Sequence, residues 1–226
     1  MQFTLLLISI LITLSSCKKA PVTDNNPAAI NTPQSEVATK TPIINRITQN
    51  NLASKVKFKL ENGEEAFSLK PKENGIKIED ADGSEIARLT VDEQRKIKIK
   101  NAADKTLGYV VSKDKYWKIE NSAQTEELYI LRQQADGDYK LETEGNRQIY
   151  RIKRRDYGWE IETPQKESLY KVKAKENKIV LRDKNEATVI KTKSDIPLLA
   201  VACFGFDILT QKQQSALAYA IALAGE

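Results

Sequence analysis

The chain has 226 residues, of which 40% are hydrophobic and 30% charged, and its 36 basic and 31 acidic side chains give a formal net charge of +5. This is the composition of a globular protein with room for one sizeable domain, and the modest positive charge fits an anionic membrane surface without favouring nucleic acid as a partner. The chain contains no histidine, which excludes histidine-based general base catalysis and histidine metal ligands.

The N-terminus has the pattern of a targeting segment. An apolar run over residues 3–14 leads into the tetrapeptide Leu-Ser-Ser-Cys that ends at Cys17, and such segments are removed from the mature protein. The pattern resembles a bacterial lipoprotein signal peptide, in which an aliphatic and two small residues precede a lipid-bearing cysteine. The resemblance implies that residues 1–16 are a signal peptide and that Cys17 carries diacylglycerol and a fatty acyl group such as palmitate. An ordinary secretory signal and a single membrane anchor are the alternatives.

Residues 17–52 are predicted to be a flexible tether. The stretch is rich in Pro, Asn, Thr and Ala and has no apolar period, so it cannot bury enough surface to offset the entropy of ordering. A flexible coil of this length reaches roughly 30–35 Å on average. Lys18 and Lys19 follow Cys17 and no Asp stands beside them; by resemblance to Gram-negative lipoproteins, this implies the periplasmic face of the outer membrane.

The rest of the chain, residues 53–226, is predicted to be one domain built from a repeat. Short segments with alternating polar and apolar residues recur every 19 to 21 residues, in two interleaved series. The first series is 86–89, 107–110, 128–131, 149–152, 169–172 and 188–191, and the second is 76–78, 97–99, 117–119, 139–141, 159–161 and 179–181. With turn signals such as Asp82-Gly83 between them, these segments predict six antiparallel hairpins, or twelve strands. An earlier pair around Asn62-Gly63 is a candidate for a seventh hairpin.

The alternation also predicts which residues face inward. In five of the first-series strands, Ala, Gly or Tyr is followed two positions later by an aliphatic residue, and this more apolar set is expected to face the core. The pairs are Ala87 and Leu89, Gly108 and Val110, Tyr129 and Leu131, Tyr150 and Ile152, and Tyr170 and Val172. The outward neighbours include Lys and Arg, and the strands are too short to span a bilayer.

Twelve strands predict a closed barrel with a bore that something must fill. At about 4.8 Å spacing and 40° tilt, the backbone diameter is roughly 24 Å and the free bore roughly 14 Å, which matches one helix. Residues 195–209 are almost entirely apolar, and a helix that is apolar on every side must be surrounded by protein. We therefore expect a mainly β fold: a closed antiparallel barrel around a C-terminal central helix.

Several residues of this central helix have expected roles. Asp195 is predicted as its N-cap, with Pro197 in the first turn. Leu199 is expected inside the bore, and Cys203, the only other cysteine besides Cys17, as a small buried hydrophobe. Gly205 should permit close approach of a tyrosine from the wall. The candidates for that ring are Tyr129, Tyr150 and Tyr170.

A second C-terminal helix is predicted over residues 211–224. Thr210 and Gln213 have the spacing of a capping box. The helix is expected to close one mouth of the barrel. The alternative places this second helix inside the barrel in place of the first.

Antiparallel hairpins followed by an apolar C-terminal helix resemble the tubby-like superfamily, which includes tubby C-terminal domains, LURP-one-related proteins and phospholipid scramblases. The resemblance covers residues 56–209, and this chain differs by continuing into a second helix. Tubby domains bind phosphoinositide headgroups at a basic barrel surface, which implies an anionic-lipid site. The candidate residues are Lys96, Lys98, Lys100, Arg147, Arg151, Lys153, Arg154 and Arg155. An ordinary solvated strand face is the alternative.

No catalytic, cofactor or metal site is predicted. The chain has no Ser/His or Cys/His arrangement, and the acidic segment 79–85 lacks the spacing of an EF-hand, which favours a plain hairpin turn. We therefore expect a non-catalytic, lipid-anchored module that binds at the membrane surface, with anionic headgroups as the expected ligand and no identified protein partner. Scramblase-like phospholipid handling is the alternative function.

Overall fold

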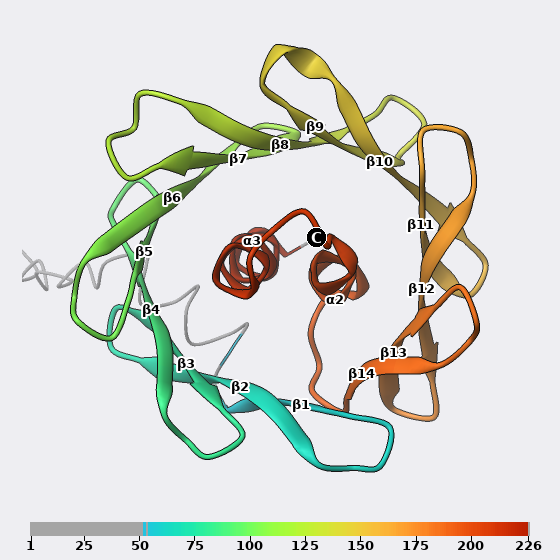
Figure 1. Cartoon of the computed structure of the whole chain (residues 1–226), viewed down its shortest axis with the longest axis horizontal. Helices are drawn as coiled ribbons and strands as arrows, with labels where there is room; N and C mark the ends of the chain where they lie inside the picture. Colours follow the sequence, from blue (N-terminus) through green and yellow to red (C-terminus); the bar gives the residue numbers. More distant parts are fainter. Residues whose placement is uncertain (1–51, 53, 226) are drawn as a thin grey trace, which may run out of the picture. The chain divides into compact units, whose positions relative to one another are not determined.

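Fourteen antiparallel strands follow one another around a closed barrel, and two helical segments lie inside it (Figure 1). The computed structural model describes residue 52 and residues 54–225. The predicted signal peptide, Cys17 and nearly all of the predicted tether therefore lie outside the described residues. Leu52, at the end of that tether, is only 5% exposed and packs in the core.

The strands are β1 (Val56–Lys59), β2 (Glu65–Lys72), β3 (Gly75–Asp80), β4 (Glu85–Val91), β5 (Ile97–Lys100), β6 (Thr106–Lys113), β7 (Tyr116–Asn121), β8 (Glu127–Gln133), β9 (Tyr139–Thr143), β10 (Gln148–Arg155), β11 (Gly158–Glu162), β12 (Ser168–Lys175), β13 (Lys178–Asp183) and β14 (Thr188–Thr192). The closed antiparallel barrel is confirmed. All six predicted hairpins form, and the candidate around Asn62-Gly63 makes the seventh, β1–β2. Fourteen strands rather than twelve widen the backbone to roughly 28 Å and the bore to roughly 18 Å.

One β-bulge per hairpin bends the sheet. The pairing register shifts once in each of the seven hairpins, between Ile78 and Glu79 in β3, for example. The equivalent shifts lie at Phe58/Lys59, Ile99/Lys100, Ile119/Glu120, Gln148/Tyr150, Ile161/Glu162 and Leu181/Arg182. A bulge increases the local bend and twist of its strand. Repeating it at the same place in every hairpin gives the sheet a regular curvature, which lets it close.

The predicted inward set does face the bore. Its aliphatic members are at most 1% exposed. These are Leu89, Val110, Leu131, Ile152 and Val172. The acidic segment 79–85 forms a plain hairpin turn, as expected, in which Asp80 Oδ1 accepts the backbone N–H of Asp82 at 3.1 Å and of Ser84 at 2.8 Å.

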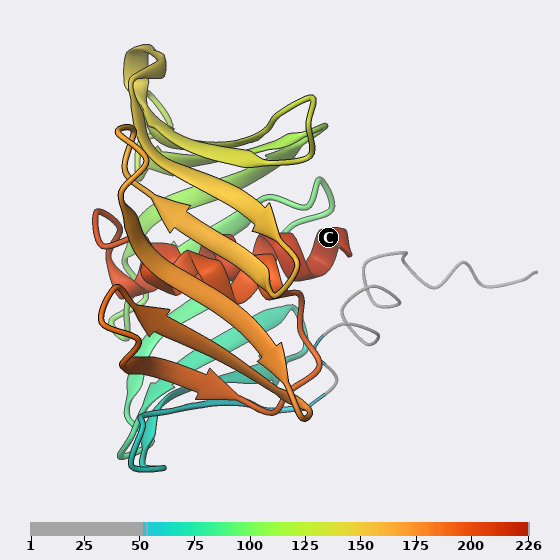
Figure 2. The ribbon, with the colours of Figure 1, turned by 90° about the vertical axis from the view of Figure 1, so that its right-hand side faces the viewer.

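Both C-terminal helices lie in the bore, side by side (Figures 1 and 2). The first is a short α-helix, α2 (Leu198–Ala202), extended by the 3₁₀ turn η2 (Cys203–Gly205), and it packs against β11, β12 and β13. The second, α3 (Gln211–Ala224), packs against α2 and, on its other side, against β4 to β7. A further 3₁₀ turn, η1 (Glu144–Asn146), joins β9 to β10.

This arrangement corrects two expectations about the helices. Residues 195–209 do not form one continuous helix, and α3 does not close a mouth: its residues from Ser215 to Leu223 are all buried. The wider bore needs two helices, and the small residues of α3, four of them alanines at alternate positions from Ala216 to Ala222, allow it to pack closely against α2 and the wall.

Aromatic side chains fill the space beside the helix pair. Phe204 of η2 packs against Phe58 and Phe67 with ring centroids 4.8 and 5.1 Å away. On another side, Phe206 stacks on Tyr150 of β10 at 5.8 Å. Two helices side by side leave gaps in a round bore, and these rings occupy them.

The roles expected for residues of the first helix are partly confirmed. Leu199 is 2% exposed and Cys203 is fully buried, so burial holds the pKa of the Cys203 thiol well above its usual value. A side chain at Gly205 would lie 3.2 Å from the Tyr170 ring, as the close-approach prediction requires. The N-cap prediction is wrong: Pro197, not Asp195, occupies that position, because the chain is irregular from Lys193 to Ile196 and becomes helical only at Leu198.

The predicted tyrosine ring gathers around the link between the helices. The Tyr170 hydroxyl donates to Asp207 Oδ2 at 2.7 Å, and the Tyr129 hydroxyl donates to the carbonyl of Ile208 at 3.4 Å. The capping box at the start of α3 is confirmed, with both the Thr210 and the Gln213 side chains engaged. These contacts fix the turn that lets the chain run back through the bore.

Replacing Leu199 with alanine tests the packing of the helix pair. Leu199→Ala should lower the free energy of unfolding by about 2–5 kcal/mol, because it leaves a cavity between α2 and the wall. Denaturant unfolding monitored by circular dichroism measures the change. Ile208→Ala is the matched control, since Ile208 is 47% exposed and its loss should cost under about 0.5 kcal/mol. Equal costs for the two variants would contradict the buried helix pair.

Candidate functional site

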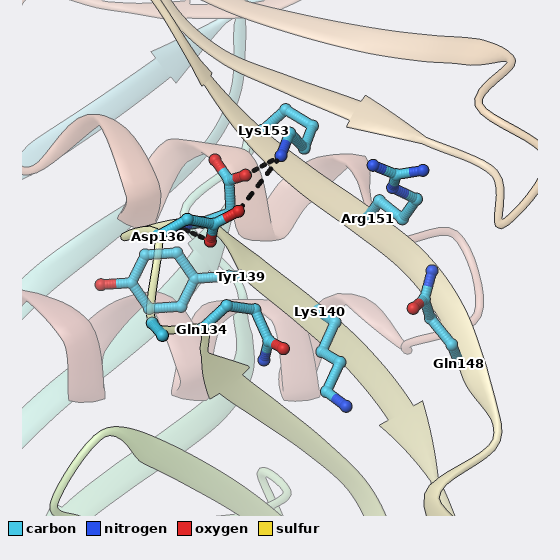
Figure 3. Close-up of a pocket in the computed structure, with 9 residues that line it drawn as sticks. Gln134, Asp136, Tyr139, Lys140, Gln148, Arg151 and Lys153 are labelled. Carbon is cyan, nitrogen blue, oxygen red and sulfur yellow. Dashed lines mark hydrogen bonds and ion pairs between the residues drawn. The ribbon is translucent and has the colours of Figure 1, made fainter.

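The basic run of β10 lines a hollow on the outer face of the barrel (Figure 3). The hollow has a volume of about 430 Å³ and lies along β9 and β10. Lys153 reaches the carboxylate of Asp138 and lies 3.5 Å from that of Asp136. The hydrogen bond with Asp138 holds the pKa of Lys153 above its ordinary value.

The arginines of this run are also paired with carboxylates. Arg151 Nε lies 3.7 Å from Glu162 Oε2, and Arg155 contacts Glu160 at 2.7 Å and Glu162 at 2.6 Å. The pKa of Arg155 lies above its ordinary value, mainly because of the hydrogen bond to Glu160. An anionic ligand in this hollow would have to displace the carboxylates that pair with Arg151 and Lys153, so the hollow is poorly suited to bind one.

Arg155 and the remaining predicted site residues do not line that hollow. Arg147 is exposed beside η1, and the Arg154 guanidinium lies 6.0 Å from the Trp159 ring at a barrel mouth.

The three predicted lysines of β5 and its preceding turn form a separate group, with four strands between β5 and β10. Lys96 and Lys98 lie 5.4 and 5.8 Å from the Tyr109 ring, and Lys100 pairs with Asp104 at 3.1 Å. The eight predicted residues therefore do not converge on one surface.

A different basic site lies where the barrel closes. β1 and β14 share a single register pair, Lys59 with Lys191, whereas every other adjacent pair of strands shares four to six. The two strands therefore separate beyond this pair, toward the start of β1 and the end of β14. A cleft of about 550 Å³ occupies the opening, and we call it the seam cleft.

Lysines dominate the lining of the seam cleft. They are Lys55, Lys57, Lys59, Lys178, Lys191 and Lys193. Ser54, Thr192 and Ser194 add hydroxyl groups, and Asp195 is the only carboxylate among the described lining residues. Alternation along β1 and β14 places the lysines of both strands on the outer face, while Val56 and Phe58 face the core.

The lysine pair at the seam lacks the shared carboxylate that bridges several comparable pairs elsewhere, and so does the pair Lys175–Lys178 of β12 and β13. Like charges directly opposite each other on neighbouring strands are destabilising. In four other such pairs, one carboxylate lies within 4 Å of both cations. These pairs are Lys70–Lys77 with Glu79, Lys77–Arg88 with Glu85, Arg88–Lys100 with Asp104, and Arg132–Lys140 with Glu142. In residues 54–225, no carboxylate forms an ion pair with Lys59 or Lys191.

The other lysines of the cleft divide into two groups. Lys55 pairs with Glu79 at 3.2 Å, and Lys57 pairs with Glu65 at 2.8 Å, so one wall is held in place. Lys178 and Lys193, like Lys59, form no ion pair within the described part of the chain. Lys191 Nζ donates only to the carbonyl oxygen of Glu61, at 2.8 Å. Three lysines are thus free to meet an external anion.

The sequence shows these lysines but not their proximity. Lys57 and Lys59 alternate with apolar residues in the same way as the predicted group around Lys98. They meet Lys191 and Lys193 only because the first and last strands become neighbours when the barrel closes. Pairing the first and last strands of the predicted barrel and counting their outward-facing charges would have indicated this site.

Comparison of the chain with protein-family models, with curated proteins and with solved structures finds no match. The resemblance to the tubby-like superfamily therefore stays a prediction. Among the described residues, no helix combines the length and hydropathy needed to cross a bilayer. The same residues contain no cluster of three or more Cys, Asp or Glu side chains placed to hold a metal ion.

Glu79 offers a test of the fixed wall of the seam cleft. Its side chain is 7% exposed; burial acts to raise its pKa, but hydrogen bonds from Lys55 and Lys77 and the charge of Lys70 outweigh burial and leave the pKa below 4.5. A lowered folded-state pKa contributes stability above about pH 4.5, which is lost as pH falls through that folded-state value. Glu79→Gln should therefore lower the free energy of unfolding by about 1–3 kcal/mol at pH 7.

Repeating the stability comparison at low pH tests whether the charge on Glu79 causes the difference. Near pH 3 the difference between Glu79→Gln and the unsubstituted protein should shrink, because the carboxylate begins to protonate in both folded and unfolded chains. Glu73→Gln, in an exposed turn, is the control and should change stability little at either pH. A difference that stayed constant from pH 7 to pH 3 would show that charge on Glu79 contributes nothing.

Proposed function

We propose that the protein is a non-catalytic binding module, anchored to a membrane through a lipid on Cys17, that recognises anionic lipid headgroups at the seam cleft. The observation that carries this proposal is the unbridged pair Lys59–Lys191 with two further unpaired lysines beside it. A phosphate at this position would act as the carboxylate does in the four bridged pairs. Lysine ammonium groups are compact charges suited to this contact.

The covalent path of the chain supports the same site. Ser54 lines the seam cleft, so the segment that leads back to Cys17 joins the barrel beside the cleft. A lipid on Cys17 would keep the cleft within tether reach of a bilayer surface. The proposed location is the periplasmic face of the outer membrane, by resemblance of the residues after Cys17 to those of Gram-negative lipoproteins.

The charge of the cleft sets the expected strength of binding. A basic residue near an anionic membrane contributes about 1 kcal/mol, an effect that salt screens. Lys59, Lys178 and Lys193 together would therefore contribute roughly 3 kcal/mol at low salt. The paired arginines of β10 should contribute less, because internal carboxylates already neutralise them.

Vesicle sedimentation separates the seam cleft from the basic run of β10. The chain from Lys18 to Glu226 keeps every described residue of the barrel and lacks the anchor. We expect it to bind phosphatidylglycerol vesicles better than phosphatidylcholine vesicles, with affinity falling as salt rises. The triple variant Lys59→Gln, Lys178→Gln, Lys193→Gln should bind at least tenfold more weakly at low salt.

The charge-matched control is the triple variant Arg151→Gln, Arg154→Gln, Arg155→Gln, which removes the same number of cations from β10. It should bind within about threefold of the unsubstituted chain, since most of its cations are internally paired. A larger loss from the β10 variant than from the lysine variant would move the site to β10. Equal binding to both kinds of vesicle would contradict the proposed function.

A further inference from the structure

Figure 1 shows the segment that carries the chain from β14 into the bore. The seam cleft is one of three neighbouring hollows that residues of this segment line. A hollow of about 540 Å³ shares Lys178, Lys193 and Asp195 with the seam cleft. It also shares Ala174 and Leu198 with a third hollow of about 550 Å³, which we call the mouth hollow. The shared residues place the three hollows side by side around one end of the barrel.

The lining changes in character from one end of this series to the other. The seam cleft is lined by lysines and hydroxyl groups, and the middle hollow adds the apolar side chains of Ile179 and Leu198. The mouth hollow adds aromatic and aliphatic residues, which line it together with the charged side chains of Arg154, Arg155 and Asp156. The apolar part of its lining includes Tyr139, Tyr157, Trp159, Pro197, Leu198 and Leu199. Apolar and aromatic walls with a few polar groups are typical of small-molecule sites.

The side chains of the mouth hollow form an ordered wall. The Trp159 ring packs edge-on against Tyr139 with centroids 5.5 Å apart, and the Arg154 guanidinium lies 6.0 Å from the same Trp159 ring. Leu198 is only partly buried although it begins α2, so apolar surface remains accessible at this mouth. Exposed apolar surface beside a cationic cleft matches a ligand with an anionic head and an apolar chain.

We propose that these three hollows together bind a single-chain anionic phospholipid, with its phosphate at the lysines of the seam cleft and its acyl chain along Leu198 toward Trp159. The proposal rests on the proposed function, because it uses the same headgroup site, and adds a place for the chain. The size of the mouth hollow is that of a pocket for one drug-sized group. This favours one acyl chain over two.

Tryptophan fluorescence reports directly on the acyl end. The protein has two tryptophans, of which Trp159 lines the mouth hollow and Trp117 is 3% exposed and does not. The probe is 1-oleoyl-lysophosphatidylglycerol, held below its micelle concentration and titrated into the chain from Lys18 to Glu226. We expect a saturable emission change that persists in Trp117→Phe and disappears in Trp159→Phe.

Variants at each end separate the head from the chain. The Lys59, Lys178 and Lys193 triple glutamine variant should weaken lysolipid binding at least tenfold. Leu198→Asn should weaken it severalfold while leaving binding to phosphatidylglycerol vesicles unchanged. Since Leu198 also contacts the core, Ala174→Gln serves as a second variant, because Ala174 is exposed and a polar side chain there obstructs the middle hollow without disturbing packing.

Two further probes complete the test. Glycerol 3-phosphate, the head alone, should compete with the lysolipid without changing Trp159 emission, and zwitterionic lysophosphatidylcholine should bind at least tenfold more weakly. Absence of a saturable Trp159 response, while vesicle binding still depends on the lysines, would overturn this inference and leave the proposed function standing. Equal affinity for the two lysolipids would overturn it as well. If the unsubstituted chain bound neither phosphatidylglycerol vesicles nor the lysolipid, both proposals would be contradicted.

Discussion

The need to fill the bore governs this structure. A closed barrel of fourteen strands encloses a space roughly 18 Å wide, and a void of that size would forfeit the packing that stabilises a protein interior. The chain supplies the filling from its own C-terminus as the antiparallel pair of α2 with η2 and α3. Alanines in α3, Gly205 in η2 and the aromatic side chains beside them adapt two helices to a round bore.

The same requirement accounts for the weak seam. The last strand cannot run alongside β1 for its full length, because the chain must leave the wall after Thr192 and reach the bore by Pro197. The strands part where this departure begins, and the outward lysines of β1 and β14 are left around an opening. The proposed site is thus a consequence of how the barrel is closed and filled, and not an addition to it.

The sequence predicted the repeating part of the fold well, because the alternation and turn residues that define each hairpin lie within one short stretch of the chain. Alternation around Leu89 or Val172 is local, and so is the capping box at Thr210. The helix packing was harder to predict, since the number of helices in the bore depends on whether the hairpin at Asn62-Gly63 joins the barrel. That one hairpin sets the diameter.

The candidate site was less accessible to sequence reasoning. Arg151 and Arg155 stood out as a run, but their partner Glu162 comes from the neighbouring strand and cancels much of their charge. Conversely, Lys59 and Lys191 are 132 positions apart in the sequence and become neighbours only on closure. Charge along a strand is local information, whereas charge balance across strands depends on register and topology.

Hydrogen–deuterium exchange of the chain from Lys18 to Glu226 bound to phosphatidylglycerol vesicles tests the site most directly. A headgroup in the seam cleft should slow exchange at residues 54–59 and 191–198, because β1 and β14 share only one backbone pair and the amides that face the seam lack the partners that β2 and β13 supply on the other side. Phosphatidylcholine vesicles should leave these segments unchanged. Protection confined to residues 134–155, along the paired basic run of β9 and β10, or vesicle binding with no protection at β1 and β14, would contradict the seam as the binding site.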